Sequence, residues 1–133
     1  MSSDSEIEKE IQAKGLTAPR ITPADIEANI ESERYFTAAE GVQGAYAARG
    51  GVHPHGGSPS QEEHQTLGLL TFCVLVLRNG FTVTGESACA SPENFDAELG
   101  RKIARRNAAA KVWPLMGYEL RSQLDRPRIQ SCH

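Results

Sequence analysis

Residues 67–96 read LGLLTFCVLVLRNGFTVTGESACASPENFD, and this stretch decides the fold. The Asn79-Gly80 pair is typical of a two-residue type I′ turn, in which both turn residues need a positive φ. Counting outward from that turn pairs Arg78 with Phe81, Val76 with Val83, and Val74 with Gly85. The stretch therefore predicts an antiparallel β-hairpin.

The strand before the turn is apolar on both of its faces, although a half-buried strand should alternate. The predicted register places one apolar set on one face: Phe72, Val74, Val76, Phe81 and Val83. The other face carries Cys73, Leu75 and Leu77, beside Thr82 and Thr84. An isolated two-stranded ribbon is marginal in water, and its open edges invite pairing. We expect a second subunit to cover Leu75 and Leu77 or to extend the sheet, in a homodimer or higher homo-oligomer. The alternative is a monomer in which a helix over residues 23–34 covers that face.

A long helix is expected after the hairpin. Ser91 followed by Pro92 and Glu93 is a typical helix start, with a capping hydroxyl, proline and then an acid. Apolar residues then recur near helical spacing: Phe95, Leu99, Ile103, Ala110, Trp113, Leu120 and Leu124. Pro114 is expected to kink or break this helix. One face of the hairpin should pack on it.

The remaining segments complete the expected organisation. Residues 1–40 form an acidic helical arm, with a short helix ending near Gly15 and a second one, over 23–34, capped by Thr22. Residues 41–66 hold six glycines and two prolines and are predicted to be a flexible loop. Residues 67–124 are the core domain, and 125–133 a disordered tail. The fold class is α+β, with the hairpin packed on a helix kinked near Pro114.

Charge and cysteine content narrow the class of protein. The 133 residues carry a formal net charge of −3, which argues against non-specific DNA wrapping. Residues 1–40 hold nine acids and four bases, and residues 91–124 hold four acids and six bases. Three cysteines, without a Cys-x-x-Cys pair or a secretory leader, favour a reduced cytoplasmic protein. No apolar run approaches the roughly 20 residues that span a bilayer.

No catalytic constellation stands out, so we expect a protein that is not an enzyme and that needs no cofactor. The histidines lie in the 41–66 loop or at the C-terminus, and no metal site is expected there. Arg101 and Arg105 share a helix face and suit phosphates, while Phe95 offers a stacking surface. The alternative is that Phe95 is a core residue and that the arginines are solvated or bridge to the acidic arm.

Residues 7–40 and 67–124 resemble the small tailed-phage and prophage proteins of the gene-product-forty-nine/sixty-six-like family. The most specific portion is NGFTVTGESACASPENFD. The 41–66 loop is longer and richer in glycine than the family pattern, so nothing is carried over to it. The family has no settled activity. Its plan of a hairpin followed by a long helix is similar to that of the phage Thoeris anti-defence one proteins, which are non-enzymatic sponges for a cyclic ADP-ribose isomer.

This second resemblance implies a ligand near a subunit interface, held by an aromatic ring and by arginine and asparagine side chains. The positions it indicates are Asn94, Phe95, Arg101, Arg105 and Asn107. The implied function is an anti-defence protein of the bacterial host cytoplasm that sequesters a signalling nucleotide without catalysis. The alternative is a phage accessory protein that binds a host protein or nucleic acid. Nucleic-acid binding would weaken steeply as salt rises.

Overall fold

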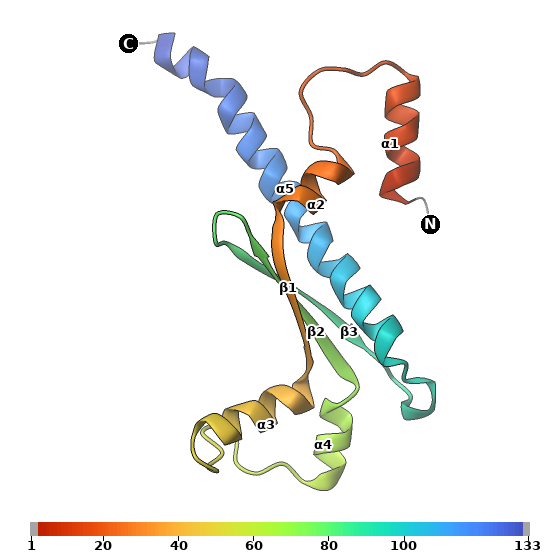
Figure 1. The fold of residues 1–133 in the computed structure, drawn as a ribbon, viewed down its shortest axis with the longest axis vertical. Helices are drawn as coiled ribbons and strands as arrows, with labels where there is room; N and C mark the ends of the chain where they lie inside the picture. The colour runs from red at the N-terminus through yellow and green to blue at the C-terminus, as the bar shows by residue number, and fades with distance from the viewer. Residues whose placement is uncertain (1–2, 132–133) are drawn as a thin grey trace.

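The computed structural model describes residues 3–131, with side chains as far as Arg126. The fold is α+β, as predicted, with a three-stranded antiparallel sheet in the order β1-β2-β3 lying on one long helix (Figure 1). The elements follow in the order α1 (Asp4–Ala13), α2 (Pro23–Asn29), β1 (Ile30–Thr37), α3 (Ala38–Ala48), α4 (Gln61–Leu67), β2 (Leu70–Leu77), β3 (Thr82–Ala88), the 3₁₀ turn η1 (Pro92–Asn94) and α5 (Ala97–Ser131).

The hairpin is present, but its turn and register differ from the prediction. The Leu77 amide donates to the Phe81 carbonyl at 2.8 Å, so three residues rather than two form the loop. Gly80 has φ 87°, and no described non-glycine residue has a positive φ, so Asn79 does not adopt the type I′ conformation. This is a turn with a glycine bulge. It pairs Leu75 with Val83, and this slip of one residue moves Val83 to the Leu75 face.

The helix predicted over 23–34 is wrong in its second half. α2 ends at Asn29, and residues 30–37 form β1, antiparallel to β2. β-Branched and aromatic residues, among them Ile30, Tyr35 and Phe36, favour a strand here. Pairing with the buried strand β2 outweighs the apolar spacing that indicated a helix. The chain itself therefore supplies the third strand.

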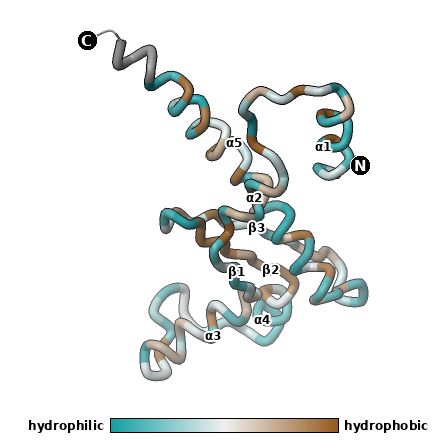
Figure 2. Tube along the Cα trace, turned by 45° about the horizontal axis from the view of Figure 1, so that its top comes forward, coloured by the Kyte–Doolittle hydropathy of each residue, from teal (hydrophilic) through white to brown (hydrophobic). Residues whose placement is uncertain are grey.

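The core lies between the sheet and α5. Cys73, Leu75, Leu77 and Val83 point from the strands toward α5, which contributes Ala104, Ala108 and Val112, while α2 adds Ile26. Figure 2 shows hydrophobic residues concentrated along the strands and in this layer, with hydrophilic residues around it. The expectation that a second subunit covers Leu75 and Leu77 is corrected, because α5 covers both side chains.

α5 starts later and ends later than predicted. Residues 92–94 form η1, and Asp96 caps α5 by accepting from the Leu99 amide at 3.1 Å. The helix then runs through Pro114 without ending and continues to Ser131. Loss of one backbone donor at Pro114 is tolerated where Val112 and Trp113 pack into or against the core. The predicted disordered tail is thus helical as far as Ser131, and residues 132–133 lie outside the described part.

Two short helices occur in the segment that was predicted to be a flexible loop. α3 follows β1 directly, with a capping box between Thr37 and Glu40, and α4 precedes β2. Both lie beyond one end of the sheet, and α1 lies at the other end (Figure 1). In the described residues, no helix combines the length and the apolar character needed to cross a bilayer.

Candidate functional site

Two small hollows flank Phe95 at the start of α5. The first, of about 180 Å³, lies between the end of β1, the start of α3 and the first turns of α5. The second, of about 140 Å³, lies between the end of β3, the Phe95 segment and α5. Phe95 and Thr71 line both hollows. The aromatic ring predicted as a stacking surface therefore stands between two concave surfaces.

The local sequence explains this geometry. The η1 turn and the Asp96 cap place the half-buried Phe95 between the sheet and α5. Gly100 lets α5 approach the sheet closely, because a Cβ at this position would lie 3.2 Å from the Thr71 hydroxyl oxygen. The buried Thr71 on β2 thus lines both hollows, and Gly100 on α5 lines the second.

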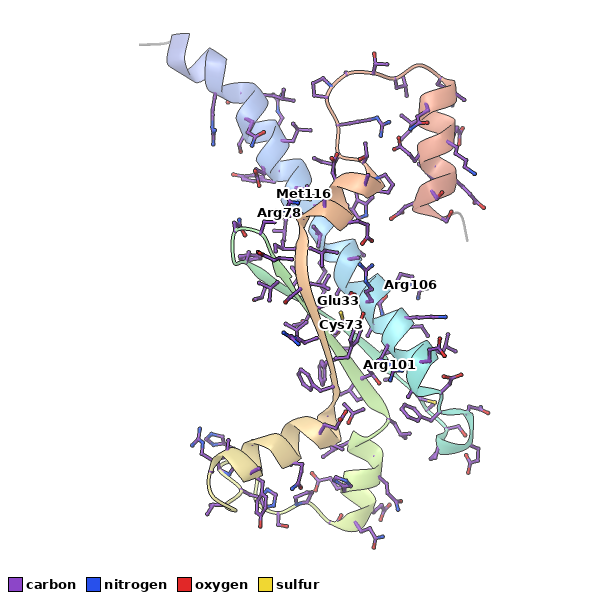
Figure 3. All side chains as sticks on the ribbon, viewed as in Figure 1. Glu33, Cys73, Arg78, Arg101, Arg106 and Met116 are labelled. Carbon is purple, nitrogen blue, oxygen red and sulfur yellow. The ribbon has the colours of Figure 1, made fainter. Side chains whose placement is uncertain are left out.

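Arg101 is the cation of the first hollow. Its side chain is exposed on α5 (Figure 3). It lines the hollow with Tyr35, Glu40 and Phe95. Glu40 already accepts from the Thr37 amide at 2.9 Å as part of the α3 cap. No ion-pair partner of Arg101 is found within the part of the chain that the structure describes. Arg101 is therefore free to meet an anion.

Arg105 is not available in the same way. Its guanidinium makes paired hydrogen bonds to Glu27 at 2.7 and 3.1 Å, and its Nε donates to Glu33 at 2.6 Å. These contacts hold α5 against α2 and β1. The sequence left open whether the arginines bridge to the acidic arm, and Arg105 does so. Hydrogen bonding to Glu27 is the main cause that raises the pKa of Arg105.

The Arg105 bridge should make the stability of the fold depend on pH. The hydrogen bond from the Arg105 guanidinium lowers the pKa of the Glu27 carboxyl below its usual value. A carboxyl with a lowered pKa stabilises the fold above its unfolded-state pKa, and this contribution is lost as pH falls through the folded-state pKa. The Arg105→Met variant should therefore melt below the wild type at pH 7, and the gap should narrow toward pH 3.

The control for this pH series is Arg106→Met, because Arg106 is exposed on the same helix (Figure 3). The midpoint of thermal unfolding, followed by circular dichroism, is measured for the wild type and for both variants. We expect a modest gap, on the order of 1 kcal/mol, because both carboxylates are partly exposed. A gap for Arg105→Met that stays constant from pH 7 to pH 3 would contradict a stabilising bridge to Glu27.

Asn94 and Asn107 occupy different places. Asn94 lines the second hollow with Phe95. Asn107 lies elsewhere, and its amide donates to the Glu86 carbonyl at 2.8 Å, on the outer edge of β3. The structure thus brings Asn94, Phe95 and Arg101 together around the hollows, whereas Arg105 and Asn107 hold α5 to the rest of the fold.

Polar residues that line the first hollow were missed by the prediction, among them Tyr35, Glu40 and Thr71. The Tyr35 hydroxyl donates to Glu33 at 3.1 Å, and burial together with this bond raises the pKa of Tyr35 to about 12. Burial also raises the pKa of the Cys73 thiol, opposite Tyr35 on β2. The phenol therefore remains a neutral hydrogen-bonding group beside the hollow. Tyr35 could have been predicted only if residues 30–37 had been recognised as a strand.

Metal ligands do not converge in the described residues: no three His, Cys, Asp or Glu side chains form a cluster that could hold an ion. His53 packs its ring against Tyr46, with centroids 4.5 Å apart, and His64 lies in α4. Cys89 donates its thiol to the Ser91 carbonyl at 3.1 Å.

Comparison with known proteins gives the family. Residues 21–124 match the model of the phage protein (N4 Gp49/phage Sf6 gene 66) family. The chain belongs to this family. The resemblance to the gene-product-forty-nine/sixty-six-like family is confirmed, and the matched range covers β1, the whole hairpin and most of α5, whereas α1 lies outside it. We found no match among curated proteins or among solved structures.

Proposed function

We propose that this phage family member binds and sequesters a small signalling nucleotide, of the cyclic ADP-ribose isomer type, in the cytoplasm of the bacterial host. The observation that supports this proposal is that Phe95 and Arg101 line the first hollow together, while Phe95 also lines the second. An aromatic face stacks on a purine ring, and a guanidinium binds phosphate oxygens bidentately. A nucleotide carries both groups.

The size of the hollows limits how a nucleotide would bind. Each is smaller than the roughly 300 Å³ at which small-molecule pockets usually begin, at about 180 and 140 Å³. The ligand would therefore lie across Phe95, with its base over one hollow and its phosphates toward Arg101. Asn94 would supply an amide to the base or ribose at the second hollow.

These side chains favour binding of the nucleotide without its chemical conversion. The carboxylates at the hollows have structural tasks, since Glu40 closes the α3 cap and Asp96 caps α5. Groups held in this way can position a ligand but are poorly placed to exchange protons with it. The anti-defence role is proposed because the plan of a hairpin followed by a long helix resembles the Thoeris anti-defence sponges and because the chain belongs to a phage protein family.

Thermal unfolding of the purified protein against a panel of cyclic nucleotides and cyclic ADP-ribose isomers tests the proposal. A ligand at 100 times its Kd should add about 2.7 kcal/mol of stability, which is visible as a raised midpoint. The Arg101→Ala variant should lose most of this shift, because the phosphate would lose its cation.

Arg106→Ala is the matched control, since it removes an exposed arginine from the same helix that lines neither hollow. It should retain the ligand-induced shift. Equal losses for Arg101→Ala and Arg106→Ala would indicate attraction by general charge and would overturn the site. If no compound on the panel raises the midpoint, the alternative of an accessory protein that binds a host protein or nucleic acid takes precedence.

A further inference from the structure

The face of the sheet that points away from α5 carries an apolar central strand, with mostly polar residues on the two strands beside it. Cross-strand pairing sets three rungs on this face: Ser32–Val76–Thr82, Arg34–Val74–Thr84 and Phe36–Phe72–Glu86. The central strand is apolar at each rung, and its three side chains are only partly buried. Interfaces between proteins commonly have this arrangement of an apolar core within a polar rim.

The described chain covers only one end of this face. α3 reaches the Phe36 end, where Gly41 faces the Phe36 ring and Phe36 stacks on Phe72 with centroids 5.5 Å apart. α5 packs on β2 and β3 from the opposite face, where the core lies. Val74 and Val76 thus form an apolar strip without a covering element among residues 3–131.

The charged residues at the two edges of this face indicate which partner it fits. Arg34 lies on β1 and Glu86 on β3, at opposite edges of the same face. A two-fold axis parallel to β2 would place β1 of each copy over β3 of the other, so that each Arg34 approaches the partner's Glu86 diagonally. An axis perpendicular to the strands would instead bring β1 onto β1 and the two Arg34 side chains toward each other. The face is therefore complementary to itself in one orientation.

We propose that this face binds a second copy of the chain, with the two sheets packed face to face about a two-fold axis parallel to β2. Aligned sheet packing of this kind is common for antiparallel sheets. Three strands about 4.8 Å apart, each rising ~3.3 Å per residue, give a modest patch. It is smaller than the roughly 800 Å² per partner of a standard interface, so the dimer should dissociate in the micromolar range.

Sedimentation velocity from low-micromolar to several hundred micromolar protein tests the proposal. The wild type should change from monomer to dimer over this range, and Val74→Glu should remain monomeric because it buries a charge at the centre of the interface. Leu124→Glu is the control, since Leu124 is an exposed apolar residue on α5, 48% accessible, away from the sheet. It should dimerise like the wild type.

Charge exchange tests the orientation. Arg34→Glu and Glu86→Arg should each weaken the dimer by about tenfold, because each places like charges together. The double variant should return close to the wild type. Both side chains lie on the margin and point away from the core, so these variants remain informative if Val74→Glu does not fold. A wild type that stays monomeric, a dimer lost with Leu124→Glu, or a double variant no tighter than the single ones would overturn the proposal.

Discussion

Replacing Gly85 by alanine is expected to destabilise the fold more than any other single methyl addition in the described chain. Gly85 lies on β3 opposite Cys73, on the face that α5 covers. A Cβ at this position would lie 2.2 Å from both the Ala104 carbonyl oxygen and the Ala108 amide nitrogen. These are backbone atoms of a rigid helix, so they cannot move aside as a side chain would. The cost should reach or exceed about 3 kcal/mol, the upper range for overpacking.

Urea unfolding measures this loss, with Gly117→Ala as the matched control. Gly117 lies within α5, and a Cβ there meets nothing within 4 Å. Alanine should therefore stabilise that position by roughly 0.5 to 1 kcal/mol through helix propensity. If Gly85→Ala unfolds at the same urea concentration as the wild type, the close approach of α5 to β3 is wrong.

Truncating Leu75 should give the second large effect. Its side chain is fully buried at the centre of β2, between the sheet and α5. Leucine-to-alanine changes at such positions cost about 2 to 5 kcal/mol, because they remove apolar contacts and leave a cavity. We expect Leu75→Ala to lower the urea midpoint sharply, with an unchanged slope.

The neighbouring residue provides the comparison. Val74 lies on the opposite, partly exposed face of the same strand. Val74→Ala, measured at a protein concentration where the chain is monomeric, should cost less than about 1 kcal/mol. Similar losses for Leu75→Ala and Val74→Ala would show that α5 does not cover the Leu75 face selectively.

The sequence predicted the parts of the fold that local signals specify. Thr22 caps α2 as predicted, and the hairpin and the long helix are present. The hairpin register was missed because Asn79-Gly80 fits a two-residue turn, and also the three-residue turn with Gly80 at the bulge. Because the register differs by one residue, each side chain of β3 lies on the opposite face of the sheet from the one predicted.

β1 was missed for a different reason. Residues 23–34 carry a strong helix start at Thr22-Pro23 and acidic residues that continue it, whereas the strand depends on pairing with β2, whose residues lie 34 to 47 positions later in the chain. Tertiary contacts of this kind override local propensity. The long helix also extended through Pro114, because one missing donor does not end a helix whose neighbours pack in the core.

The candidate site was predicted in its aromatic and cationic parts but not in its extent. The spacing of Phe95 and Arg101 placed both at the start of α5, where they line the first hollow. Spacing alone could not separate Arg101 from Arg105, which share a helix face. Only the positions of Glu27 and Glu33, on α2 and β1, show that Arg105 is bridged.

The most direct test of sequestration is recovery of the ligand. The nucleotide that gives the largest thermal shift is incubated with excess protein, and free nucleotide is measured by equilibrium dialysis before and after heat denaturation of the protein. We predict that free nucleotide falls in proportion to the protein added and returns in full, with unchanged mass, when the protein unfolds. Free nucleotide that never falls, or a product of altered mass after heating, would contradict the proposed function.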